Sequence, residues 1–297
     1  MIPAAPTLFL YACTILIWGT TWLAITLQLG RVDPLVSVFY RFLAAALLSL
    51  ALCGALRLRM RFRPREHLWI ALQGFLNFTI GYWMVYAAER VIASGLAAVV
   101  TSSLIFMNIL GGRLFLKKPV RGHVVSGATL GISGIVLIFL PEFSHLHWSD
   151  RTFQGLVLCT VSTVFYSLGN IVAERNQRSG MPVLQTNALG MGYAALILLA
   201  CVWLSGKRID FDPSLRYAGS LAYLSLFGSI AAFWCYMTLI GRIGADRAAY
   251  GPLVVPVLAL GLSSVFEGYR WSAPAAIGIL LIIAGNLLVL GKRKRKT

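Results

Sequence analysis

The chain has 297 residues, of which 58 % are hydrophobic and only 12 % are charged, and its formal net charge is +16. Its mean hydropathy of +0.78 excludes the soluble globular class and indicates an integral membrane protein. Almost no sequence remains for a soluble domain once the apolar stretches are assigned to the membrane.

Ten apolar stretches follow one another along the chain, each close to the roughly 20 residues that a helix needs to cross a bilayer. They alternate too rarely for barrel strands, and backbone in lipid must satisfy its own hydrogen bonds, so we predict helices. The first stretch lacks the charged start of a signal peptide, and we count it as a span. The predicted spans are residues 6–28, 35–56, 68–88, 93–116, 123–140, 153–173, 183–204, 217–241, 247–266 and 273–291.

The last five stretches repeat the pattern of the first five. Because five is odd, the two halves enter the membrane from opposite sides. We therefore predict an all-α polytopic membrane protein with ten transmembrane helices in two inverted five-helix repeats, residues 1–146 and 147–297, around a central cavity. Inverted repeats commonly present one site alternately to the two membrane faces, which is how a transporter works.

The basic residues follow this topology. If both termini are cytoplasmic, the inside segments hold 17 of the 26 Lys and Arg residues and the outside segments hold seven. The positive-inside rule then places the N- and C-termini in the cytoplasm. The alternating arginines from Arg57 to Arg65 are expected to contact anionic membrane lipid, and we predict no nucleic-acid partner.

Two alignments of the chain with itself support the repeat. At an offset of 151 residues, the fourth and fifth spans align with the ninth and tenth, and Gly127 and Gly134 fall on Gly278 and Gly285. Such glycines mark close helix contacts. We favour packing within a monomer, and a dimer stays open.

The first and sixth spans align at an offset of 148 residues. Each carries a polar and aromatic stripe with spacing i, i+4, i+8, which forms one helix face. We favour cavity lining for this stripe, and packing or interfacial anchoring stays open. The aligned residues are Thr14, Trp18 and Trp22 with Ser162, Tyr166 and Asn170.

Four further stretches carry a family resemblance: 17–21 (IWGTT), 40–45 (YRFLAA), 89–98 and 278–285. Together with ten spans and a five-plus-five repeat, they resemble the EamA-repeat transporters of the drug/metabolite transporter superfamily, over essentially the whole chain. Within that superfamily the chain looks like the bacterial exporters of aromatic amino acids. One departure is that Lys118 and Tyr269 stand where family members often carry a glutamate.

The resemblance implies a central cavity lined by spans 1, 3, 4, 6, 8 and 9. Each of these spans offers aromatic, hydroxyl or amide side chains, and Pro252 and Pro256 can kink the ninth. We predict that the substrate-binding residues are Trp18, Trp22, Tyr82, Tyr86, Thr101, Asn108, Tyr166, Asn170, Trp234 and Tyr250.

Charged groups are expected to lie away from this cavity. All ten carboxylates and four histidines fall in predicted loops or at helix ends, whereas proton-coupled carriers usually keep such a group at membrane depth. Arg41 and Arg113 lie near helix ends, where we expect them to snorkel and serve structure. The five cysteines show no disulfide or metal spacing. We predict no cofactor, no metal and no catalytic residue.

The sequence thus predicts a multi-pass exporter of the bacterial inner membrane for aromatic or apolar amino acids or related small metabolites. Its solute is neutral or zwitterionic and partly aromatic, and it moves by alternating access without ion coupling. One alternative is a multidrug or cationic-compound exporter of the same superfamily, acting through cation–π contacts. Another is a polytopic lipid-modifying enzyme, although the chain carries no HExxH, Walker or nucleophile-elbow motif.

Overall fold

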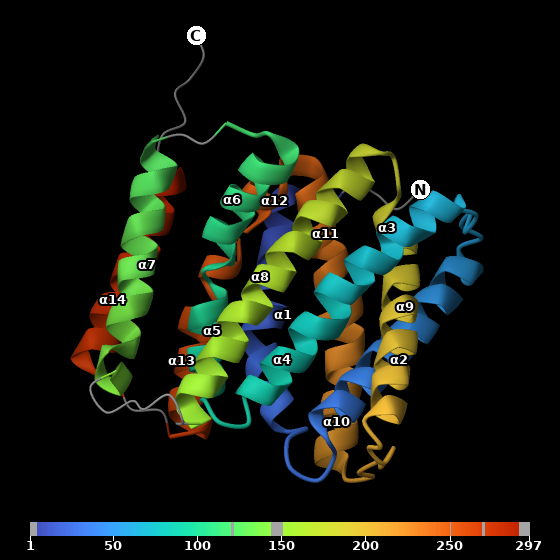
Figure 1. The fold of residues 1–297 in the computed structure, drawn as a ribbon, viewed down its shortest axis with the longest axis horizontal. Helices are drawn as coiled ribbons and strands as arrows, with labels where there is room; N and C mark the ends of the chain where they lie inside the picture. The colour runs from blue at the N-terminus through green and yellow to red at the C-terminus, as the bar shows by residue number, and fades with distance from the viewer. Residues whose placement is uncertain (1–4, 120–121, 144–150, 250, 269–270, 291–297) are drawn as a thin grey trace.

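The computed structural model of the chain describes residues 5–119, 122–143, 151–249, 251–268 and 271–290. Every regular element within these ranges is a helix, which confirms the predicted all-α class (Figure 1). In the first half the elements are α1 (Thr7–Thr26), α2 (Pro34–Ala55), α3 (Pro64–Gly74), η1 (Phe75–Ile80), α4 (Gly81–Ala88), α5 (Ser94–Thr101), α6 (Leu104–Leu116) and α7 (Gly122–Phe143). In the second half they are α8 (Arg151–Arg178), α9 (Val183–Leu204), α10 (Leu215–Tyr223), η2 (Leu224–Ala231), α11 (Ala232–Ile243), α12 (Ala245–Ala248), η3 (Gly251–Leu253), α13 (Val255–Phe266) and α14 (Ala273–Leu290).

Seven helical segments of the described residues are long and apolar enough to cross a membrane. Residues 255–266 of α13 and 273–285 of α14 form shorter apolar helices. The chain is therefore a multi-pass membrane protein. The count of ten spans and the inverted arrangement stay predictions.

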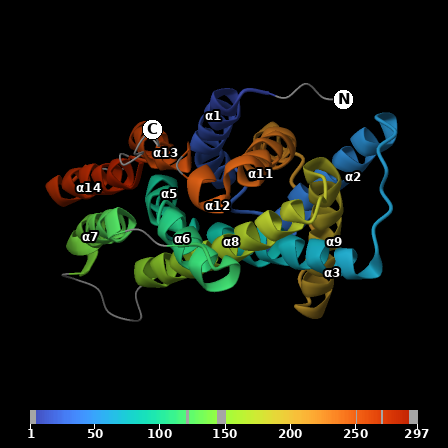
Figure 2. The ribbon, with the colours of Figure 1, turned by 90° about the horizontal axis from the view of Figure 1, so that it is seen from above.

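Helices of the two halves pack against each other in matched pairs. In the first half α1 contacts α11 and α13, and in the second half α8 contacts α4 and α6. Two further pairs join corresponding helices, α2 with α9 and α7 with α14. Figure 2 shows α7 and α14 side by side at one edge of the bundle, with α2, α3 and α9 at the other. Two copies of one five-helix unit would produce this pattern of contacts.

Glycines allow the closest of these approaches. A Cβ atom on Gly134 would lie 2.4 Å from the carbonyl oxygen of Gly278, and one on Gly285 would lie 2.5 Å from that of Gly127. A Cβ atom does not approach a non-bonded oxygen so closely, so the packing of α7 against α14 needs glycine at these positions. The glycine face of α7 is thus occupied within the chain.

The central helices depart from regular α geometry at corresponding places in the two halves. The π-helical turns η1 and η2 begin at Phe75 and Leu224, 149 residues apart. The predicted fourth span is broken between α5 and α6, and the predicted ninth is broken between α12 and α13. Irregular backbone inside a membrane protein is tolerated where it is buried or lines a cavity, and π-turns often occur at functional sites.

Side-chain chemistry explains both breaks. The hydroxyl of Ser102 donates to the carbonyl oxygen of Val99 over 2.6 Å and competes with the helical hydrogen bonds. In the second half, Pro252 and Pro256 have no backbone N–H to donate.

Candidate functional site

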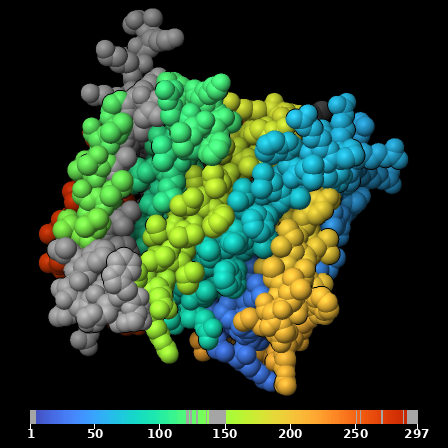
Figure 3. All heavy atoms as spheres, viewed as in Figure 1, coloured from blue at the N-terminus to red at the C-terminus, as the bar shows by residue number. Residues whose placement is uncertain are grey.

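A cavity lies where these irregular segments meet, and its volume is about 80 Å³. Pockets for drug-sized ligands usually measure about 300–1,000 Å³, so side chains must move before a solute fits. Figure 3 shows α8 crossing the face of the molecule that covers this region, between α6 on one side and α3 and α4 on the other. The lining residues are Trp18, Thr21, Trp22, Ile25, Asn77, Tyr82, Val85, Ala98, Thr101, Ser102, Leu104, Tyr166, Asn170, Phe233, Tyr236, Pro252 and Val255.

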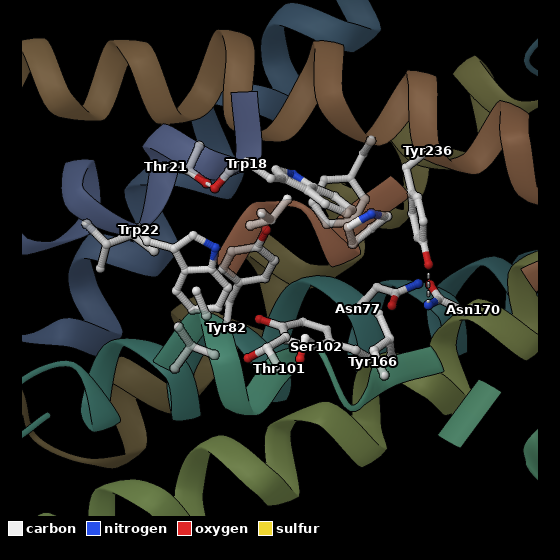
Figure 4. Close-up of a pocket in the computed structure, with 17 residues that line it drawn as sticks. Trp18, Thr21, Trp22, Asn77, Tyr82, Thr101, Ser102, Tyr166, Asn170 and Tyr236 are labelled. Atoms are coloured by element: carbon white, nitrogen blue, oxygen red, sulfur yellow. Dashed lines mark hydrogen bonds between the residues drawn. The ribbon is translucent and has the colours of Figure 1, made fainter. Parts of the chain in front are cut away.

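Aromatic rings form much of the cavity wall (Figure 4). The Trp18 ring centroid lies 4.8 Å from that of Tyr236 and 5.2 Å from that of Phe233. The rings of Tyr82 and Tyr166 meet edge to face with centroids 5.5 Å apart. Such rings offer large apolar contact area, and their faces attract positive charge. Both halves of the chain contribute to the cluster.

Neutral polar groups complete the wall. Asn170 donates from Nδ2 to the hydroxyl of Tyr236 over 3.2 Å (Figure 4), and the Trp18 indole N–H donates to the Gly228 carbonyl over 3.3 Å. Asn77, on η1, is buried, and its Nδ2 has no hydrogen-bond partner. A buried amide without a partner is costly, so Nδ2 is available to a polar group of a solute. No charged side chain is among the described residues that line the cavity.

Six of the ten predicted substrate-binding residues line this cavity. Thr101 also donates to the Ala97 carbonyl over 2.8 Å, so its hydroxyl is already engaged by its own helix. The structure does not test whether any of the six contacts a solute. The six are Trp18, Trp22, Tyr82, Thr101, Tyr166 and Asn170.

Tyr86 and Asn108 lie outside the cavity wall. Tyr86 is fully buried, and its hydroxyl donates to Gln28 over 2.8 Å. Asn108 donates from Nδ2 to the carbonyl of Ala245 over 3.1 Å, which holds α6 against the start of α12. Both side chains are used in helix packing. Tyr250 falls outside the described residues.

Trp234 does not line the cavity either, whereas Phe233 and Tyr236 on the same helix do. Trp234 packs instead beside a small core of Cys53, Leu184 and Ala188. The spacing of residues shows which side chains share a face of α11, but not which face of that helix is turned toward the cavity.

The predicted set of substrate-binding residues leaves out Asn77, Thr21 and Ser102 as well as Phe233 and Tyr236. Thr21 falls three residues after Trp18 on α1, so the stripe identified there could have included it. Asn77 is an amide within an apolar span, which is a signal in itself. Ser102 stands beside the predicted Thr101.

The burial of Arg41 departs most from what the sequence predicted. We expected it to snorkel toward a helix end, but it is 0 % exposed. Its guanidinium donates to Ser229, Tyr86 and Tyr82 over 2.9, 3.3 and 3.5 Å. It lies inside the bundle behind Tyr82, next to the cavity but not in its wall.

Two carboxylates are also buried, one near each end of α8. Glu174 accepts from Lys118, Arg178 and the backbone N–H of Ala245. Glu89, directly after α4, is 5 % exposed, and neither of its oxygens has a hydrogen-bond partner. Burial, and then the charge of Glu267, raise the pKa of Glu89 well above its ordinary value. Both residues lie at helix ends, as expected, yet both are removed from water.

The EamA-like transporter family profile matches the chain twice, over residues 5–140 and 153–291. The uncharacterized inner membrane transporter YedA of Escherichia coli K12 is 31 % identical over 93 % of this chain and 88 % of its own length. Protein PagO of Salmonella typhimurium is 25 % identical, covering 96 % of this chain and 92 % of its own. A probable amino-acid metabolite efflux pump of Salmonella typhimurium is 24 % identical, covering 97 % of this chain and 96 % of its own. A solved crystal structure superposes with a TM-score of 0.75 at 18 % identity, over 98 % of this chain and 99 % of that one, which shows a shared fold.

Proposed function

Since this chain belongs to the EamA-like transporter family, we propose that it exports aromatic or other apolar amino acids, or related small metabolites, by alternating access. The observation that carries this proposal is the central cavity, which both halves line with aromatic rings, hydroxyls and amides. Such a wall suits a solute that is partly aromatic and neutral overall. One relative is described as a probable amino-acid metabolite efflux pump.

The arrangement of the two halves supports alternating access. The cavity lies between them, the family profile matches once in each, and the π-turns and helix breaks recur at corresponding positions around the cavity. These features are typical of carriers in which two repeats rock around a shared site. We propose ten spans in two inverted repeats, divided near residue 146.

The chain is proposed to lie in the inner membrane, as the name of YedA states for that relative, with both termini in the cytoplasm. The test is single-cysteine labelling at position 61, predicted to face the cytoplasm, and at position 147, predicted to face outside. A membrane-impermeant reagent added outside should modify only position 147. Modification of position 61 alone would reverse the orientation.

The decisive experiment is counterflow of labelled solutes in proteoliposomes that contain the purified protein. Phenylalanine, tyrosine, tryptophan and leucine should exchange, whereas lysine, glutamate and ethidium should not. Replacing Trp18 or Phe233 with alanine should remove about 1 kcal/mol or more of contact, which is several-fold in apparent affinity. Trp203→Ala is the matched control, because Trp203 is 79 % exposed. Exchange of ethidium but of no amino acid would instead support the multidrug exporter.

We also propose that transport needs no ion gradient. The cavity wall holds no carboxylate among its described residues, and Glu89 lies beyond it. Solute should therefore equilibrate across the liposome without accumulating when a pH gradient is imposed. Concentrative uptake that is driven by the gradient and lost in Glu89→Gln would overturn the uncoupled mechanism and assign the coupling to Glu89.

A further inference from the structure

Arg41 is a positive charge buried among neutral groups. All of its hydrogen bonds run to hydroxyls, of Ser229, Tyr86 and Tyr82. Its guanidinium carbon lies 4.5 Å from the Tyr82 ring centroid and 5.6 Å from that of Phe42. Within the described part of the chain, no carboxylate lies within ion-pair distance of it.

Hydroxyls and ring faces offset only part of the cost of burying such a charge. A buried cation is normally paired with an anion, and an ionisable residue kept inside a membrane protein usually has a function. The guanidinium also has more N–H groups than the three hydroxyls use, and its planar shape fits a carboxylate with two parallel hydrogen bonds. The charge of Arg41 acts on the buried Glu89 from beyond ion-pair distance, so the guanidinium retains room for direct contact with an anion of carboxylate geometry.

The position of Arg41 allows a solute in the cavity to supply that anion. Tyr82 lies against the guanidinium and also lines the cavity. Gly228, on η2, permits a close approach on another side, since a Cβ atom there would lie 3.0 Å from Nη2 of Arg41 and 2.9 Å from Thr21. Thr21 is itself part of the cavity wall. A single layer of side chains thus separates the charge from the cavity.

We propose that Arg41 recognises the carboxylate of the transported solute, and that Tyr82 covers it until the solute enters. This rests on the proposed function and narrows it to solutes that carry a carboxylate next to an apolar group. When Tyr82 swings aside, the guanidinium reaches the cavity and the volume grows. The apolar part of the solute then lies against Trp18 and Phe233.

The test compares ligands that differ only in their charged groups. Phenylalanine carries both charges, 3-phenylpropanoate only the carboxylate and phenethylamine only the ammonium. Leucine and 4-methylpentanoate form an aliphatic pair. Apparent dissociation constants come from ligand-induced shifts in the melting temperature of the protein in detergent, which need no transport activity. Wild-type protein should bind 3-phenylpropanoate more tightly than phenethylamine.

In Arg41→Gln, binding of both carboxylate compounds should weaken by about ten-fold or more, the loss of a charge-assisted hydrogen bond, while binding of phenethylamine changes less than two-fold. Arg41→Lys, which keeps the charge but not the fork, should fall between. Arg113→Gln is the matched control, an exposed arginine in α6. Equal weakening of all ligands in Arg41→Gln would assign Arg41 to structure alone and overturn the proposal.

Binding measurements on the wild-type protein test the proposal even if Arg41→Gln does not fold. Equal or tighter binding of phenethylamine than of 3-phenylpropanoate overturns carboxylate recognition without any variant. The two proposals also fail separately. Arg41-dependent binding of 4-methylpentanoate without binding of any phenyl compound supports Arg41 and rejects an aromatic solute. Counterflow of phenylalanine with no preference for a carboxylate supports the transport proposal and rejects this one.

Discussion

A buried carboxylate lies near each end of α8, and the two differ in whether other groups compensate their charge. Glu174, near the end of the helix, has a side chain that is 3 % exposed and contacts Lys118 and Arg178 over 2.8 and 2.6 Å. Glu89 lies near the start of the same helix, where Gly155 packs against Ala88 and Ile92, and its oxygens have no partner. One carboxylate is fully compensated and the other is not.

The two ends of α8 are therefore stabilised by different interactions. Lys118 belongs to the first half and also contacts Asp246 over 2.8 Å, so the ion pairs at the Glu174 end join both halves of the chain. At the other end, Glu267 accepts from Ser94, and its charge acts on Glu89. Ion pairs stabilise the Glu174 end. The Glu89 end is stabilised by packing around a carboxyl group that favours its neutral form.

The largest effect is expected from Glu174→Gln. Removing one partner of a buried ion pair leaves the other charges uncompensated and costs about 3 kcal/mol in the free energy of unfolding. We place the cost at the lower end of the usual range because the side chains of Lys118 and Arg178 are 21 % and 55 % exposed. Chemical unfolding in detergent, followed by circular dichroism, measures it.

Asp210→Asn is the control for this experiment, because Asp210 is an exposed carboxylate in the loop before α10. It should leave the free energy of unfolding unchanged within about 0.5 kcal/mol. A loss in Glu174→Gln no larger than that of the control would remove the claim that ion pairs hold this end.

The next effect is a pH dependence at the Glu89 end. Because its pKa is raised in the folded protein, Glu89 keeps its proton over a pH range in which the unfolded chain has lost it. Stability is therefore fully present below the ordinary carboxyl pKa and falls as pH rises from there through the raised pKa. The expected slope is about 1.4 kcal/mol for each pH unit within this range.

Melting temperatures of wild type and Glu89→Gln across this range test the prediction. The variant has no proton to lose, so its curve should be flatter and should lie above that of wild type at the higher pH. Glu267→Gln should also flatten the curve in part, since it removes a charge that raises the pKa of Glu89. Parallel curves for wild type and Glu89→Gln would show that Glu89 ionises normally.

Regular helices are the parts of the site that sequence patterns predicted well. On α1 and α8 the spacing of i, i+4 places Trp18 with Trp22, and Tyr166 with Asn170, in the cavity wall. Thr14 and Ser162, which belong to the same stripes, are buried outside that wall. On α11 the prediction selected Trp234, whereas its neighbour Phe233 lines the cavity. The residue pattern of one helix does not indicate which of its faces is turned toward the cavity.

Burial of charge was the second limit. The place of Arg41 depends on Gly228 and on hydroxyls from α4 and η2, all distant in sequence from α2. Glu89 is likewise buried by neighbours from other helices. Hydropathy along one helix predicts where that helix spans the membrane. It does not predict the burial of a charged residue by several neighbouring helices. Lys118 likewise forms ion pairs with Glu174 and Asp246, two residues of the second half that the pattern around Lys118 does not indicate.

The smallest effect is expected from Asp246→Asn, which removes the outer partner of Lys118 and leaves Glu174 in place. The side chains of Lys118 and Asp246 are 21 % and 31 % exposed, so water and salt screen their attraction. Partly exposed ion pairs contribute about 0.2–1 kcal/mol, and we expect a loss of about 0.5 kcal/mol in the free energy of unfolding.

Raising the salt concentration to about 1 M should largely abolish this difference from wild type, because the screening length then falls to about 3 Å. The deficit of Glu174→Gln should persist in the same salt, since the Glu174 side chain is buried. If both variants lost the same stability, or if salt abolished both losses, the ion pairs at this end would act as a surface network and the contrast between the two ends of α8 would disappear.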